Sequence, residues 1–194
     1  MASRIEARII DMGIRMFADR GYEGVSFRDL AKEADVTVAS LFRLFGNKQK
    51  LFEKVLTKAL EQTLDPAQFL FLIYEGGEKP DKMRLFTLTV MRWYASVSPH
   101  AARLFFQSSL QEDWRELAYS RINKVMEILG TTLQHGQSAR RADKAATRTK
   151  SAVAAHAMIF GLLQLKMTYA ASRSSKEEAE LATSMIRRWL RPVV

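Results

Sequence analysis

The stretch SFRDLAKEADVTVASLFRLF, from Ser26 to Phe45, predicts two short helices joined by a tight turn. Ser26 is a suitable N-cap for the first helix, and Asp29 three residues later completes a weak form of the capping box. The apolar residues that give this helix a buried face are Phe27, Leu30 and Ala31. Asp35 stands at the turn, and aspartate is among the few residues that tolerate the left-handed conformation.

The second helix of this stretch predicts a surface that the core does not use. Thr37 is a suitable N-cap, and Leu41 and Phe45, four residues apart, face the first helix. The residues expected to face outward are Thr37, Val38, Ala39 and Arg43. An exposed short helix after a tight turn is typical of a recognition helix in a DNA major groove.

Three spaced motifs carry a family resemblance. They are MFADRGYEGVSFRDLAKEA from Met16, V-T-x-x-x-L-F from Val36 and N-K-x-x-L-F from Asn47. Over residues 5–60 the chain resembles the amino-terminal domain of the TetR/AcrR family of bacterial repressors. The resemblance implies an all-α fold: an N-terminal three-helix helix-turn-helix DNA-binding domain over residues 1–64, and a C-terminal helical bundle over 65–194 for effector binding and dimerisation.

The chain departs from the family pattern at three places, which bear on the DNA sequence recognised and not on the fold. Asp35 stands where the family usually has glycine. Phe42 replaces a tyrosine whose hydroxyl reaches a phosphate in the family, so the ring remains and the donor is lost. Val38-Ala39 opens the recognition helix where lysine, arginine or proline followed by a small residue is common.

The motif and the resemblance together imply a set of DNA-contacting residues. The set comprises Arg28, Thr37, Val38, Ala39, Phe42, Arg43 and Lys48. We expect Val38 and Ala39 to contact thymine methyls and Arg43 to bind guanine. Lys48 opens the next helix, whose free N–H groups suit a phosphate. Arg4 and Arg8 are expected to be solvated, although in the family this end can approach the DNA backbone.

Composition favours a helical, soluble chain. Among 194 residues there are 9 glycines, 4 prolines and no cysteine, which excludes disulfides and thiolate metal sites. No apolar run approaches the ~20 residues of a membrane span, so we expect a cytoplasmic, nucleoid-associated protein. The net charge is +9, of which +2 falls within residues 1–64 and +7 within residues 65–194. The charge therefore supports only a loose affinity for polyanions, and the prediction of DNA binding rests on the helix-turn-helix motif.

Further helices are expected along the rest of the chain. Asp65-Pro66 predicts the domain boundary. Residues 136–150 are basic and lack large apolar side chains, which predicts a mobile segment. The expected helices outside the motif cover 3–20, 48–64, 66–75, 81–97, 99–111, 112–135, 147–172 and 176–191.

The last two expected helices predict a dimer interface. The helix 147–172 is apolar on nearly every side, so we expect a second subunit to cover the side that its own domain leaves exposed. The alternative is that it is a buried core helix of a monomer. The family builds its four-helix dimer interface from the corresponding helices. The interface residues expected here are Ala157, Gly161, Leu165, Met185, Ile186 and Trp189.

Residues 65–194 contain no catalytic constellation, so neither an enzyme nor a metal or cofactor site is predicted. The region is rich in methionine and aromatic residues, which fill a core or line an apolar ligand cavity. The resemblance favours the cavity, for a medium-sized and largely apolar effector. The expected lining comprises Phe86, Tyr94, Phe105, Trp114, Tyr119, Met126, Met158 and Gln164.

These patterns favour a homodimeric transcriptional repressor that binds double-stranded operator DNA and is released by a small-molecule effector. Two alternatives stay open. One is a family member that activates transcription or acts without a ligand. The other is a helical protein-interaction module that no longer recognises DNA, for which the substitutions at Val38 and Phe42 are the only indications.

Overall fold

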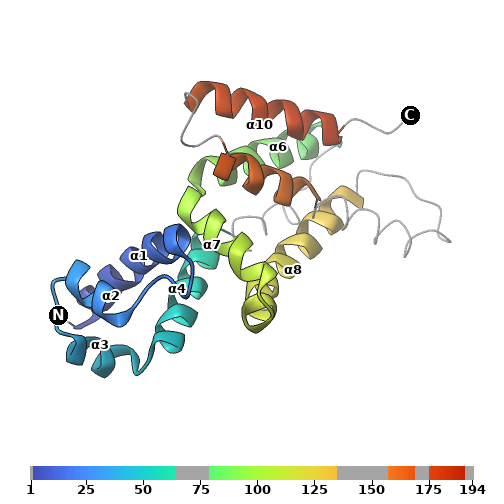
Figure 1. The fold of residues 1–194 in the computed structure, drawn as a ribbon. Coiled ribbons are helices and arrows are strands. Elements are labelled where there is room, and N and C mark those ends of the chain that lie inside the picture. The colour runs from blue at the N-terminus through green and yellow to red at the C-terminus, as the bar shows by residue number, and fades with distance from the viewer. Residues whose placement is uncertain (1, 64–78, 135–156, 169–174, 191–194) are drawn as a thin grey trace. The chain divides into compact units, whose positions relative to one another are not determined.

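A computed structural model of the chain describes residues 2–63, 79–134, 157–168 and 175–190 (Figure 1). These residues form helices and the turns between them, so the predicted all-α fold is confirmed. The helices are α1 (Ala2–Arg20), α2 (Phe27–Glu33), α3 (Val38–Phe45), α4 (Lys48–Thr63), α6 (Lys79–Ser96), α7 (Pro99–Leu110), α8 (Glu112–Gln134), a helix at 157–168, and α10 (Ser175–Leu190).

The predicted helices agree with the observed ones within a few residues wherever the chain is described. Some predictions fall elsewhere. The expected helix 66–75, the boundary at Asp65-Pro66 and the basic stretch 136–150 lie outside the described residues. The expected helix 147–172 is described only over 157–168.

Local capping explains where the first helices begin and end. The Ser26 side chain accepts from the Asp29 N–H while the Asp29 carboxylate accepts from the Ser26 N–H, so the capping box is complete. Thr37 accepts from the Ser40 N–H at 3.1 Å, and Asn47 accepts from the Lys50 N–H at 2.8 Å. The N-caps predicted at Ser26 and Thr37 are therefore confirmed, and Asn47 caps α4 in the same way.

Residues Met1–Thr63 and Ser98–Tyr119 form one compact unit, in which α1, α4 and α7 pack against one another. Gly13 permits the close approach of α1 and α4, because a Cβ there would lie 2.7 Å from Val55 Cγ2. Trp114, at the start of α8, packs on the Phe52 ring with the ring centroids 4.7 Å apart. The sequence placed residues 98–119 in the second domain, whereas packing groups α7 and the first turns of α8 with the helix-turn-helix.

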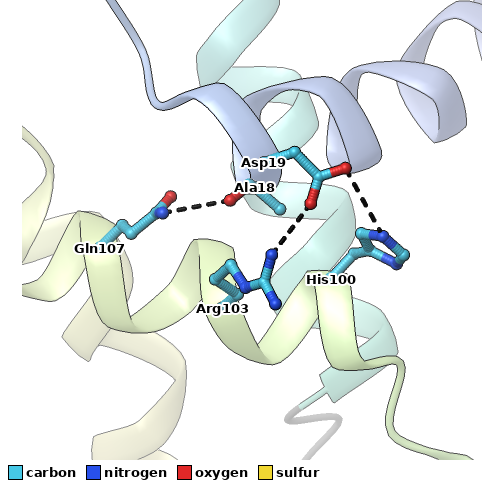
Figure 2. A network of polar contacts seen from close by, with 5 residues as sticks. All are labelled: Ala18, Asp19, His100, Arg103 and Gln107. Carbon is cyan, nitrogen blue, oxygen red and sulfur yellow. Dashed lines mark hydrogen bonds and ion pairs between the residues drawn. The ribbon is translucent and has the colours of Figure 1, made fainter. Parts of the chain in front are cut away.

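Polar contacts add to the packing of α7 on the end of α1 (Figure 2). The Arg103 guanidinium donates to Asp19 Oδ1 at 3.0 Å, and His100 Nε2 lies 3.8 Å from Asp19 Oδ2. One turn further along α7, Gln107 Nε2 donates to the Ala18 carbonyl at 3.1 Å. Successive turns of α7 thus contact two adjacent residues at the end of α1, Asp19 and then Ala18.

The second compact unit comprises Leu64–Val97 and Ser120–Val194, in which α6 packs against α10. A buried polar cluster joins three of its helices. The Tyr94 hydroxyl of α6 donates to Glu178 Oε1 of α10 at 2.8 Å, and Lys166 Nζ, from the helix 157–168, lies 3.1 Å from the same oxygen. Within the described ranges, no helix combines the length and the apolar character that crossing a bilayer requires.

Candidate nucleic-acid interface

The helix α3 divides its residues between a core and an exposed surface. Leu41 and Phe45 are buried, as the sequence predicts. Thr37, Ala39 and Arg43 are exposed and Val38 is half-buried. Three of the four side chains that were expected to face outward on α3 are therefore left uncovered by the rest of the described chain, and Val38 is partly covered.

The turn before α3 has the predicted left-handed residue. Asp35 has φ 51°, the only positive φ among the described non-glycine residues. At the other end of α3, Gly46 has φ 79°, which a residue with a Cβ adopts only with strain. These two residues fix where the recognition helix starts and stops.

Phe42 presents an aromatic ring on the outer face of α3. Its side chain is 53% exposed although it is large and apolar. The ring contacts Phe27, the first residue of α2, with the centroids 4.8 Å apart and a tilt of 45°. Phe27 was expected only as a core residue of α2, and its role as support for Phe42 was missed because the two lie on different helices.

Lys48, at the first position of α4, is held by neighbouring side chains. Its ammonium lies 4.2 Å from the centroid of the Tyr22 ring and 3.6 Å from Glu23 Oε2. Burial, followed by the nearby Glu23, raises the pKa of the Tyr22 phenol, so the ring stays neutral beneath the cation. A positive charge is thus fixed beside the N–H groups of the α4 start, where a phosphate is favoured.

Two arginines near this surface differ in their surroundings. Arg28 is exposed at the second position of α2, as a DNA-contacting side chain must be. Arg8 was expected to be solvated or to approach DNA, but its Nη2 donates to the Ala34 carbonyl at 2.7 Å. Arg8 is exposed, as expected, but this bond to Ala34, the C-cap of α2 26 residues away, was not predicted.

The structure does not gather the expected effector pocket within one unit. Phe105, Trp114 and Tyr119 belong to the unit that contains the helix-turn-helix. Trp114 packs on the rings of Tyr22 and Phe52 there, so its ring is buried in the aromatic core of that unit. Phe86 and Met126 are not among the residues whose side chains the structure describes.

The second unit holds the other members of the expected pocket. Tyr94 and Met158 are buried, whereas Gln164 is exposed. Tyr94, expected as a polar contact to the effector, is already bonded to Glu178. The pocket as a whole therefore stays a prediction.

The expected dimer residues also divide by burial. Leu165 and Ile186 are buried within their own chain, so as the structure stands they offer no surface to a partner. Gly161 and Met185 are half-buried and lie together, since a Cβ on Gly161 would be 3.3 Å from Met185 Cε. Ala157 is exposed, and the Trp189 side chain lies outside the described ones.

The fold and the exposed α3 define a helix-turn-helix DNA-binding protein. Residues 9–55 match the family described as bacterial regulatory proteins, tetR family. The biofilm operon icaADBC HTH-type negative transcriptional regulator IcaR of Staphylococcus epidermidis is 25% identical over 126 residues, which are 65% of this chain and 63% of that regulator. Over its amino-terminal part, residues 9–55, the chain is therefore similar to the tetR family of bacterial regulatory proteins.

Solved structures share the fold along nearly the whole chain. A TetR-family transcriptional regulator from Bordetella parapertussis superposes with a TM-score of 0.70 at 22% identity, covering 96% of this chain and 94% of the other. The transcriptional regulator FadR from Bacillus subtilis, solved in complex with stearoyl-CoA, has a TM-score of 0.66 at 18% identity, with 97% and 99% covered. At these identities the likeness concerns the fold.

Proposed function

We propose that the protein is a homodimeric, sequence-specific transcriptional repressor that a small, largely apolar effector releases from its operator. The observation that carries the DNA-binding part is the α3 surface, where Thr37, Ala39, Phe42 and Arg43 are all exposed beside a completed turn. The likeness of this domain to IcaR, a negative regulator, supports repression.

Each side chain of the α3 surface has a distinct role in this proposal. Arg43 binds a guanine edge through two donors and sets most of the sequence preference. Val38 and Ala39 contact thymine methyls because they carry no hydrogen-bonding group. Thr37, Arg28 and Lys48, with the N–H groups that open α4, bind the phosphate backbone and fix the register of α3 in the groove.

Dimerisation places two such helices on a roughly palindromic operator. Two recognition helices enter successive major grooves when they lie about one helical turn of DNA apart, ~34 Å. Among the predicted interface residues whose side chains the structure describes, Ala157, Gly161 and Met185 keep some exposed surface. We assign the contact between subunits to this surface.

The effector acts by preferring one arrangement of the dimer. It shifts the protein from the operator-binding state only to the extent that it binds the other state more tightly. A fold shared with FadR, which holds stearoyl-CoA, is compatible with an apolar effector. The buried Met158 of the second unit is consistent with an apolar lining.

The test is a selection of genomic DNA fragments by the purified dimer, followed by sequencing and a search for an inverted repeat. On the enriched site, Arg43→Ala is expected to weaken specific binding by ~1–3 kcal/mol and to relax preference at one base pair. Lys32→Ala is the matched control, because Lys32 is exposed on α2 and outside α3. Equal effects of the two variants would assign the loss to net charge and remove the proposed role of Arg43.

Salt dependence separates this proposal from a protein-interaction module. Binding that neutralises phosphates weakens steeply as salt rises, with a slope of about −0.9 per phosphate contacted on a logarithmic plot. An apolar protein interface lacks that dependence. A reporter placed behind the enriched site then distinguishes repression from activation, and a screen for release by apolar compounds tests the effector.

A further inference from the structure

The carbonyls at the carboxyl end of α2 receive hydrogen bonds from the turn that follows and from α1. The last carbonyls of a helix have no partner within the helix and need donors from elsewhere. The Val36 N–H donates to the Ala31 carbonyl at 3.0 Å, and the Asp35 N–H donates to the Lys32 carbonyl at 3.3 Å. The Ala34 carbonyl receives its donor from α1, through Arg8 Nη2 at 2.7 Å.

This contact lies where the direction of α3 is decided. Ala34 is buried and is the C-cap of α2; Asp35, directly after it, has the left-handed φ of 51°. Thr37 then caps α3. A change in the orientation of the Ala34 carbonyl therefore rotates the peptide that leads into Asp35, and α3 with it.

A guanidinium is well suited to hold this carbonyl. A cation at the carboxyl end of a helix is favoured by the helix dipole, and a charged donor makes a stronger hydrogen bond than a neutral one. The bond joins α1 to the turn across 26 residues of sequence, so it constrains the turn from outside the motif.

We propose that Arg8 is a positioning residue for the recognition helix: it sets the α2–α3 turn through the Ala34 carbonyl and does not serve the DNA backbone. Arg4, one helical turn earlier on the same helix and also exposed, has no described contact of this kind and is the natural comparison. The effect of Arg8 on DNA recognition rests on the proposed DNA-binding function, but its contact with the turn can be tested on the free protein.

The experiment compares Arg8→Ala, Arg8→Lys and Arg4→Ala with the wild-type chain. Affinity is measured for the enriched operator and for a scrambled duplex of equal length, each over a range of salt concentrations. For Arg8→Ala we expect the ratio of specific to non-specific affinity to fall about tenfold, since one charged hydrogen bond is lost. The slope of affinity against salt stays unchanged, Arg8→Lys restores most of the ratio, and Arg4→Ala leaves it unchanged.

Amide hydrogen exchange of the free protein supplies a readout that does not depend on DNA. We expect the amides of Asp35, Val36 and Leu41 to exchange faster in Arg8→Ala and to recover protection in Arg8→Lys. Unchanged exchange overturns the proposal whatever the protein binds. If exchange rises but the wild-type protein selects no DNA sequence, the proposed function fails and the role of Arg8 in DNA recognition fails with it.

Two results with DNA also overturn the proposal. A salt slope that falls by about 0.9 with an unchanged affinity ratio identifies Arg8 as a phosphate contact. A lower melting temperature with an unchanged ratio shows that Arg8 stabilises the fold without orienting α3. Neither result removes the proposed function, which the wild-type selection tests by itself.

Discussion

Glu178 accepts from two side chains that come from two other helices. The Tyr94 hydroxyl lies 2.8 Å and Lys166 Nζ 3.1 Å from the same carboxylate oxygen. The Lys166 ammonium also lies 5.0 Å from the centroid of the Tyr94 ring. The perturbation is Glu178→Gln, which keeps the size of the side chain and removes its charge.

The expected loss follows from what the substitution leaves behind. Removing one partner of a buried ion pair costs roughly 3–5 kcal/mol, because the other charge remains unpaired. The Lys166 and Glu178 side chains are 13% and 11% exposed, so some water reaches the ammonium. We therefore expect a loss somewhat below this range, about 2–3 kcal/mol. In the double variant with Lys166→Met the unpaired charge is gone, and we expect about 1 kcal/mol.

The assay is urea unfolding of the wild type, both single variants and the double variant. The midpoint shifts while the slope m stays constant, and the four free energies close a double-mutant cycle. Coupling of at least about 1 kcal/mol between Glu178 and Lys166 is expected. Additive losses, within about 0.5 kcal/mol, would refute the reasoning, since they would show that water already screens the pair.

The pH dependence of the same cluster has a defined sign. Burial, and then the hydrogen bond to Glu178, raises the pKa of the Tyr94 phenol above its ordinary value. On raising the pH the unfolded chain loses this proton first, near pH 10, so the contribution of Tyr94 is present below that pH and is lost above it. Tyr94→Phe should remove this part of the alkaline loss.

Three further predictions, and one control at an exposed residue, concern the first unit. Hydrogen bonds from the Ser26 side chain and backbone lower the pKa of Asp29, so the advantage of wild type over Asp29→Asn in urea midpoint should be present at pH 6 and vanish as the pH falls through that lowered pKa. Trp114→Ala should cost about 3–5 kcal/mol of unfolding free energy, because the ring is buried on Phe52. In the same unfolding assay Leu110→Ala, at a residue 78% exposed, should stay within ~0.5 kcal/mol. Phe42→Tyr should tighten operator binding by about 0.5–1.5 kcal/mol with an unchanged salt slope, since a hydroxyl adds a phosphate donor without charge; unchanged affinity would place the ring away from the backbone.

Local features of the first unit were predictable because their causes lie within a few residues. Ser26 and Asp29 complete their capping box across three residues, and Thr37 and Asn47 each cap the helix that follows. Asp35 adopts the left-handed conformation that its side chain tolerates. Such short-range chemistry needs no knowledge of the tertiary fold.

Partners across the fold were not predictable by the same reasoning. Periodicity indicates that a residue is buried, but it does not indicate which helix covers it. Trp114 was assigned to an effector pocket and instead packs on Tyr22 and Phe52. Tyr94 was likewise assigned to the effector and is bonded to Glu178, 84 residues away. The available signal for that cluster was Lys166 within a mostly apolar helix, whereas Glu178 lies among the charged residues that open α10.

The division of the chain into units bears on how the proposed effector could influence α3. The chain passes between the units at Thr63–Leu64, Val97–Ser98 and Tyr119–Ser120, and the second and third of these lead directly into α7 and out of the first turns of α8. Within the first unit α7 is bonded to α1 through Asp19 and Arg103 (Figure 2). Arg8 of α1 also donates a hydrogen bond to the Ala34 carbonyl, in the turn before α3. Packed and hydrogen-bonded contacts therefore run continuously from Ser98 through α7 and α1 to α3. Under the proposed function, an effector bound in the second unit would act on α3 along this route by binding two arrangements of α7 with different affinity.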